Sequence, residues 1–149
     1  MTDNQNTEKW CQIDTKMRSM MNFEICLDAP TSRVWQLITD TETWPCWGPS
    51  VRKVDSPERF IRTGLKGRIL TPFGIWAPFS IEKFQPERYW DWRVSGIPAT
   101  GHLVEPMDSH KSRLIFTVPA WALPYGFVCR IALNKIKQLI ALSSKTVSL

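Results

Sequence analysis

The end of the chain spaces its apolar side chains three and four residues apart, whereas the segments before it alternate them every second residue. The wider spacing predicts an amphipathic helix from Tyr125 onward. A sheet with one apolar face needs a cover, and the sequence predicts no other long helix, so we expect this helix to lie across a sheet. An alternative position on a membrane surface stays open. The apolar stripe consists of Val128, Cys129, Ala132, Ile136, Leu139 and Ile140.

The segments before this helix show the alternation of half-buried strands and are divided by turns that contain Gly or Pro. Their spacing, at about ten residues, is typical of an antiparallel meander. The sequence contains no internal repeat. We expect strands at residues 21–27, 51–60, 68–73, 78–84, 89–94, 100–104 and 112–118.

Two short helices are expected between the first two strands. Asp28 or Thr31 can cap the first, and Pro30 is tolerated in its first turn because no backbone donor is needed there. The second is kept short by prolines, and its two indole rings are expected to form a hydrophobic rim or gate. The apolar face of the first helix consists of Val34, Trp35, Leu37 and Ile38, and the second helix, of one turn, falls in the segment Trp44-Pro45-Cys46-Trp47-Gly48-Pro49.

A family resemblance rests on the residues around these two helices: Ala29-Pro30, Val34-Trp35, Asp40, Trp44-Pro45 and Trp47. This pattern resembles the START-related superfamily, also called SRPBCC, of polyketide cyclases/dehydrases and lipid-transport proteins, and the resemblance extends over residues 20–142. It implies an α+β helix-grip fold with an apolar cavity. In that fold a curved antiparallel sheet wraps around a long C-terminal helix, and two short helices follow the first strand. The superfamily includes lipid carriers, ligand sensors and cyclases, so the fold does not settle the function.

Length and composition fit one domain. At 149 residues and 43% hydrophobic, the chain can bury a core of its own. We expect residues 1–19 to form a flexible N-terminal tail and residues 20–149 to form the helix-grip domain.

The chain start and the cysteines indicate a cytoplasmic protein. The start lacks the basic and apolar segments of a secretory signal, and no apolar run is long enough to cross a bilayer. The chain has only two histidines and no Cys-x-x-Cys pair, so we expect free thiols, no metal site and no cofactor. The four cysteines are Cys11, Cys26, Cys46 and Cys129.

The formal charge of +5 at pH 7 arises in the second half of the chain. Arg62, Lys66 and Arg68 fall near one hairpin, and Arg130 and Lys135 fall on the last helix. These residues would attract anionic headgroups or an acidic ligand, so transient membrane-surface contact stays open beside a plain solvated surface. We expect no nucleic-acid partner, since no basic run is interleaved with aromatic residues. A homodimer also stays open.

Strand alternation indicates which side chains face the last helix. Trp90 and Trp92 share one strand face, and Thr100 and His102 share another. Eight tryptophans in a chain of this size fit an aromatic-lined pocket, in which small residues such as Gly101 would leave room. Two alternatives stay open: His102 as a structural histidine, and the tryptophans as plain core. The expected ligand-binding residues are Trp44, Trp47, Trp90, Trp92, Thr100, His102, Phe116, Tyr125, Cys129 and Ala132.

The sequence predicts binding or transport of a small hydrophobic or amphipathic ligand between the sheet and the last helix. The alternative is a cyclase- or dehydratase-like lyase, without metal, acting on an aromatic polyketide-type substrate. His102, Tyr125 and Arg88 are its candidates for proton transfer. The spacing of residues defines no acid–base pair, no serine triad and no phosphate loop. Glu105 falls on the strand face opposite His102, so these two residues are not expected to act as partners. Binding is therefore preferred over catalysis. A third alternative is an interaction module with a vestigial pocket.

Overall fold

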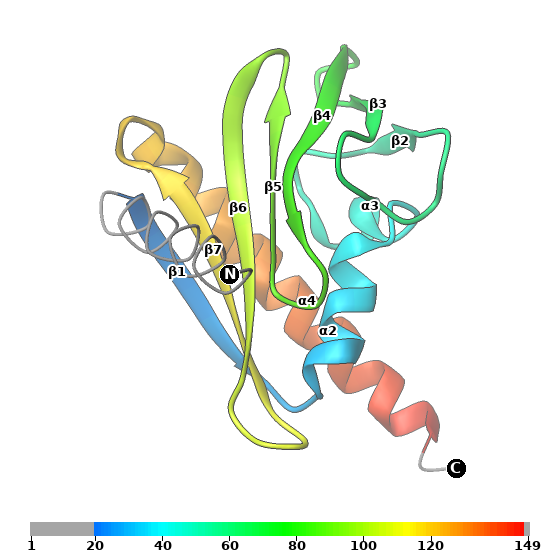
Figure 1. The fold of residues 1–149 in the computed structure, drawn as a ribbon, viewed down its shortest axis with the longest axis vertical. Coiled ribbons are helices and arrows are strands. Elements are labelled where there is room, and N and C mark those ends of the chain that lie inside the picture. Colours follow the sequence, from blue (N-terminus) through cyan, green and yellow to red (C-terminus); the bar gives the residue numbers. More distant parts are fainter. Residues whose placement is uncertain (1–19, 148–149) are drawn as a thin grey trace, which may run out of the picture.

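The computed structural model describes residues 20–147, and a curved antiparallel sheet forms its centre (Figure 1). The expected N-terminal tail, residues 1–19, lies outside the described residues. The strand order is β1-β7-β6-β5-β4-β3-β2, so strands β2 to β7 form a meander and β1 adds to β7. The strands are β1 (Met20–Leu27), β2 (Lys53–Asp55), β3 (Lys66–Leu70), β4 (Trp76–Gln85), β5 (Tyr89–Val94), β6 (Ile97–Pro106) and β7 (Ser112–Pro119).

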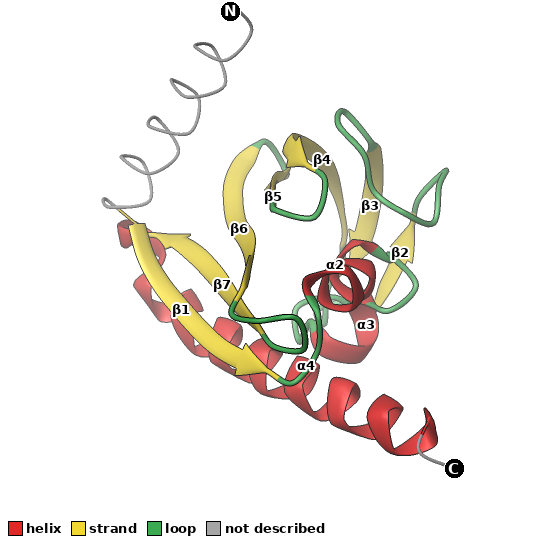
Figure 2. Ribbon diagram, turned by 60° about the horizontal axis from the view of Figure 1, so that its bottom comes forward, coloured by secondary structure: helices red, strands yellow, loops and turns green. Residues whose placement is uncertain are grey.

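The helices lie on one side of this sheet. Two short helices, α2 (Thr31–Thr39) and α3 (Trp44–Trp47), follow β1. A 3-10 helix, η1 (Ala120–Tyr125), leads from β7 into the long helix α4 (Gly126–Val147). Figure 2 shows α4 passing beneath β1 and β7, with α2 and α3 further along the same side. The predicted α+β helix-grip fold is confirmed.

The second strand is shorter than the sequence predicts. Only Lys53–Asp55 pairs with β3, instead of the whole of residues 51–60. The Ser56 hydroxyl donates a hydrogen bond to the Glu58 carbonyl, 2.7 Å away, and Pro57 between them has no N–H to offer a neighbouring strand. The chain therefore turns out of the sheet, and Phe60 returns only for an isolated bridge with Asp40.

The start of α2 also differs from the prediction. Pro30 occupies the N-cap position, and among the described side chains neither Asp28 nor Thr31 caps the helix. The Pro30 carbonyl instead accepts hydrogen bonds from the backbone N–H groups of Arg33 and Val34, at 3.1 and 3.3 Å.

Pairing between β5, β6 and β7 aligns the residues that face α4. Trp90 lies opposite His102, His102 lies opposite Phe116, and all three are buried. Successive strand residues point to opposite faces, so Gly101 belongs to the other face, where its partner on β7 is Thr117. The prediction that Gly101 leaves room in the pocket is therefore wrong.

Gly101 is required instead by close packing on the outer face. A Cβ atom there would lie 2.3 Å from Thr117 Oγ1 and 2.6 Å from Tyr89 Oη, and both side chains are buried. Gly101→Ala should therefore lower the free energy of unfolding, measured in urea, by about 1–3 kcal/mol, as overpacking does. In a Thr117→Ala background the clashing Oγ1 atom is absent, so Gly101→Ala should lower the free energy of unfolding by less. Equal costs in both backgrounds would contradict this explanation.

Candidate functional site

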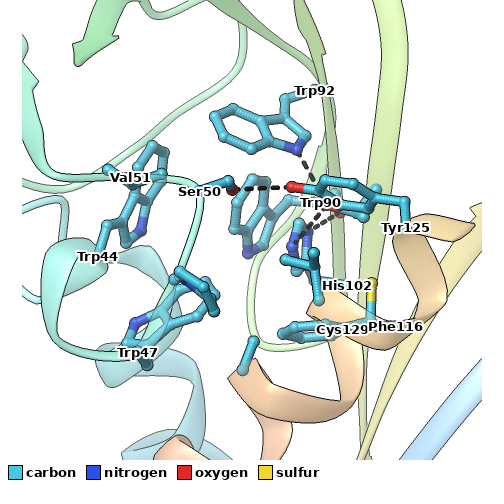
Figure 3. Close-up of a pocket in the computed structure, with 15 residues that line it drawn as sticks. Trp44, Trp47, Ser50, Val51, Trp90, Trp92, His102, Phe116, Tyr125 and Cys129 are labelled. Atoms are coloured by element: carbon cyan, nitrogen blue, oxygen red, sulfur yellow. Dashed lines mark hydrogen bonds between the residues drawn. The ribbon is translucent and has the colours of Figure 1, made fainter. Parts of the chain in front are cut away.

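A cavity lies between the sheet, the loop after α3 and the start of α4 (Figure 3). Its volume is only about 30 Å³, so it is a narrow space. All the residues expected to bind a ligand line it: Trp44, Trp47, Trp90, Trp92, Thr100, His102, Phe116, Tyr125, Cys129 and Ala132. The sequence did not indicate a lining role for the loop residues that follow Trp47 or for Val128, which belongs to the apolar stripe of the last helix. These further lining residues are Gly48, Pro49, Ser50, Val51 and Val128.

Stacked aromatic rings form the wall of the cavity. Trp90 lies between Trp44 and His102. The ring centroids of Trp90 and Trp44 are 5.5 Å apart with their planes at 5°, and those of Trp90 and His102 are 3.8 Å apart with their planes at 18°. Trp92 meets both Trp44 and Trp90 edge-on. Offset and edge-on ring pairs attract each other, so these contacts stabilise the wall. Trp44 and Trp47 are both buried, so the structure places them in this wall and not at an exposed rim.

His102 uses both ring nitrogens within the wall. Its Nδ1 lies 3.3 Å from the Trp90 carbonyl oxygen, which can only accept, so Nδ1 carries the proton. Nε2 then accepts from the Thr100 hydroxyl, 3.2 Å away, and Thr100 Oγ1 accepts from Trp92 Nε1 at 3.1 Å. Burial lowers the pKa of His102 to about 3, so the imidazole is neutral near pH 7. These contacts favour the structural role that the sequence left open for His102.

Tyr125, at the end of η1, extends over the cavity. Its Oη lies 2.8 Å from Ser50 Oγ (Figure 3). Burial raises the pKa of the Tyr125 phenol, which therefore stays protonated near pH 7. The hydrogen bond joins the loop after α3 to the junction of η1 and α4.

A second, larger space adjoins the cavity, and we call it the outer groove. Its volume is about 570 Å³. It shares Ser50, Trp92, Thr100 and Tyr125 with the cavity, so the two spaces meet at the Ser50–Tyr125 pair. Among the described residues, no charged side chain lines either space. The other residues of the outer groove are Ile69, Thr71, Val94, Ile97, Pro98, Ala99, Val118, Pro119, Trp121, Ala122 and Pro124.

Neither Arg88 nor Cys129 brings a reactive group to the cavity. Arg88 does not line it, and its Nη2 lies 3.6 Å from Glu105 Oε1, on the strand face opposite His102. Cys129 does line the cavity, but burial raises the pKa of its thiol to about 11. The thiolate is the nucleophilic form, so a thiol that stays protonated near pH 7 is inert.

Residues 20–147 hold three cysteines, but neither a candidate metal site nor a helix that could span a membrane. This range holds no group of three or more His, Cys, Asp or Glu side chains arranged to bind a metal ion. Cys26, Cys46 and Cys129 are free thiols, whereas Cys11 lies outside the described residues. Within the same range, no helix combines the length and the apolar character needed to span a bilayer.

Comparison with known proteins supports the fold and no more. No protein-family model matches the sequence, and no curated protein matches it. Among solved structures, the protein XoxI from Bacillus cereus is similar, with 18% identity and a TM-score of 0.63 over 83% of this chain and 96% of that chain. Protein CV1439 from Chromobacterium violaceum has 18% identity and a TM-score of 0.59 over 83% and 97% of the two chains. The di-domain ARO/CYC BexL from the BE-7585A biosynthetic pathway has 19% identity and a TM-score of 0.64 over 84% of this chain and 47% of BexL. These structures share the helix-grip architecture, and membership of the START-related superfamily stays a prediction.

Proposed function

We propose that the protein binds a small hydrophobic or amphipathic molecule, as a carrier or sensor does. Most of the ligand would lie in the outer groove, and its leading end would enter the cavity behind the Ser50–Tyr125 pair. The observation that carries the proposal is the continuity of the two spaces, which share four lining residues and are lined by no charged side chain among those described.

Size and polarity support this placement. The cavity alone is too narrow for a ligand of more than a few atoms, but the outer groove adds about 570 Å³. Ligand pockets typically have roughly 300–1,000 Å³ and an apolar lining with a few polar groups. Here the polar groups at the junction are the hydroxyls of Ser50, Thr100 and Tyr125. Burial of apolar ligand surface would supply the main part of the affinity.

Catalysis of the cyclase or dehydratase type has less support, although BexL shares the fold. An acid–base catalyst works best with a pKa near the operating pH. His102 has a pKa of about 3, and both of its nitrogens are engaged within the wall. Tyr125 alone would then have to transfer protons, with its hydroxyl bonded to Ser50. We therefore place binding before catalysis.

Filling the cavity from α4 should weaken binding. Ala132 is buried and lines the cavity, so Ala132→Leu puts a branched side chain where the leading end of the ligand would lie. Fatty acids, sterols and aromatic polyphenols would be titrated while tryptophan emission is recorded. We expect at least one of them to give a saturable change, and Ala132→Leu to weaken its binding by about tenfold, which corresponds to about 1.4 kcal/mol.

Ala141→Leu is the matched control, because Ala141 lies on the exposed side of the same helix. It should bind as the unaltered protein does, and thermal unfolding of both variants would verify their folds. A flat emission response to every compound would contradict the proposed function. Equal weakening by both substitutions would show that the cavity is not the binding site.

A further inference from the structure

Four indole rings line the cavity, and three of their N–H groups have acceptors within the protein. The satisfied donors are Trp44 with the Ile38 carbonyl (3.0 Å), Trp47 with the Thr43 hydroxyl (3.4 Å) and Trp92 with Thr100 Oγ1 (3.1 Å). Trp90 Nε1 is buried, and no described atom accepts its hydrogen bond. A buried donor without a partner raises the free energy of the folded protein, and an acceptor that enters the cavity relieves this cost.

The packing of Trp90 determines where such an acceptor can approach. One face of the ring is covered by Trp44 and the other by His102, so only the ring edge is left to meet a ligand. In Figure 3 the indole nitrogen lies on the side of the ring that faces Trp47. Trp47 and Trp90 both line the cavity, and the side chain of Trp90 is 1% exposed. The N–H group is therefore a buried donor on the edge of a ring that lines the cavity.

The charges around the cavity decide which acceptors fit. No Lys or Arg lines the cavity or the outer groove in the described part of the chain, and the imidazole of His102 is neutral. A carboxylate or phosphate drawn into this space would lose its hydration without meeting a counter-charge, which disfavours binding strongly. A carbonyl or ether oxygen carries no such penalty and accepts a hydrogen bond from an indole N–H.

We propose that the ligand is a neutral molecule whose leading end carries an acceptor oxygen, and that Trp90 Nε1–H donates a hydrogen bond to it. Trp90 is then the residue that selects among apolar ligands, and a molecule that would have to place a carboxylate or phosphate in the cavity is a poor ligand. The inference rests on the proposed function, because it assumes that a ligand enters the cavity.

Three naphthalenes of nearly equal shape test this selection. 2-Acetylnaphthalene carries a carbonyl oxygen, 2-isopropenylnaphthalene replaces it with a methylene group, and 2-naphthoate replaces the acetyl group with a carboxylate. Titration calorimetry at neutral pH should show the ketone binding about fivefold to tenfold more tightly than the alkene, the effect of one hydrogen bond. The carboxylate should bind most weakly. In nuclear magnetic resonance spectra of the protein, only the ketone should move the Trp90 indole proton downfield.

Two tryptophan variants provide the residue-level test. Trp90→Phe keeps an aromatic ring but removes the donor, so the preference for the ketone over the alkene should disappear. Trp35→Phe is the matched control, because Trp35 is buried but lines neither the cavity nor the outer groove, so the preference should stay in place. If Trp90→Phe does not fold, the ligand series and the indole proton of the unaltered protein still decide the question.

The possible failures are distinguishable. Equal affinities for ketone and alkene, with the Trp90 proton unmoved by the ketone, would overturn the role of Trp90 and leave the proposed function intact. Tightest binding of 2-naphthoate would overturn the requirement for a neutral ligand. No binding of any of the three, together with a flat response to the wider set of compounds, would overturn the proposed function itself.

Discussion

Replacing Trp44 with alanine should lower the free energy of unfolding by about 3–5 kcal/mol, the usual cost of deleting a large buried aromatic side chain. Trp44 is 1% exposed, its indole N–H donates to the Ile38 carbonyl at 3.0 Å, and its ring contacts Phe79, Trp90 and Trp92. The substitution therefore removes one side of the Trp90 stack, leaves a void in the wall and takes away the partner of a buried carbonyl. Urea denaturation with a constant m-value would measure the loss.

Trp121→Ala is the control for this prediction. Trp121 is 70% exposed in η1, so the same chemical change should alter the free energy of unfolding by no more than about 0.5 kcal/mol. A loss at Trp44 of less than about 1 kcal/mol, below the usual range for buried aromatics, would show that the aromatic wall does not stabilise the fold.

Acidification should destabilise the protein through His102. Burial holds the pKa of His102 at about 3 in the folded state, while an unfolded histidine has a pKa of about 6.5. Between these values the unfolded chain binds the proton and the folded chain does not, so stability falls as the pH falls. The contribution of His102 to the free energy of unfolding is complete above pH about 6.5. Below that pH it declines by about 1.4 kcal/mol per pH unit, so that roughly 3 kcal/mol is lost by pH 4.5.

Histidine variants separate this contribution from the titration of carboxylates at low pH. His102→Gln keeps a donor and an acceptor but removes the titration, so its stability should fall less steeply between about pH 6.5 and 4.5. His110→Gln changes an exposed residue of the loop between β6 and β7, and its profile should follow that of the unaltered protein. Parallel profiles for all three proteins would contradict the assignment to His102.

The wall of the cavity could be predicted from the sequence because the alternation of side chains between the two faces of a strand is a local property of the backbone. Trp90 and Trp92 had to share a face of their strand, as did Thr100 and His102, and a single long helix was available to cover those faces. The ends of elements were less predictable. The early end of β2 depends on a side-chain hydrogen bond of Ser56, and the N-cap of α2 depends on the backbone of Pro30.

The outer groove could not be predicted, because its residues come from strand ends, turns and η1, where no periodicity indicates a shared surface. Ser50 and Tyr125 illustrate the difficulty, since 75 positions separate two side chains that form one hydrogen bond. The unpaired N–H donor of Trp90 could not be predicted from the sequence either. The N–H groups of three neighbouring indoles have acceptors in the protein. Which indole lacks an acceptor depends on packing in three dimensions, which the sequence does not reveal.

The Ser50–Tyr125 pair has a consequence for the rates of ligand exchange. It joins the loop after α3 to the start of α4 at the junction of the cavity and the outer groove, where a ligand of the proposed kind would pass from one space into the other. A single hydroxyl–hydroxyl bond adds little to the free energy difference between bound and free states. Widening the passage, however, requires the loop after α3 and the start of α4 to move apart, which is slower than the rotation of one side chain. Under the proposed function, the Ser50–Tyr125 pair would therefore influence the rate of ligand exchange more than the affinity.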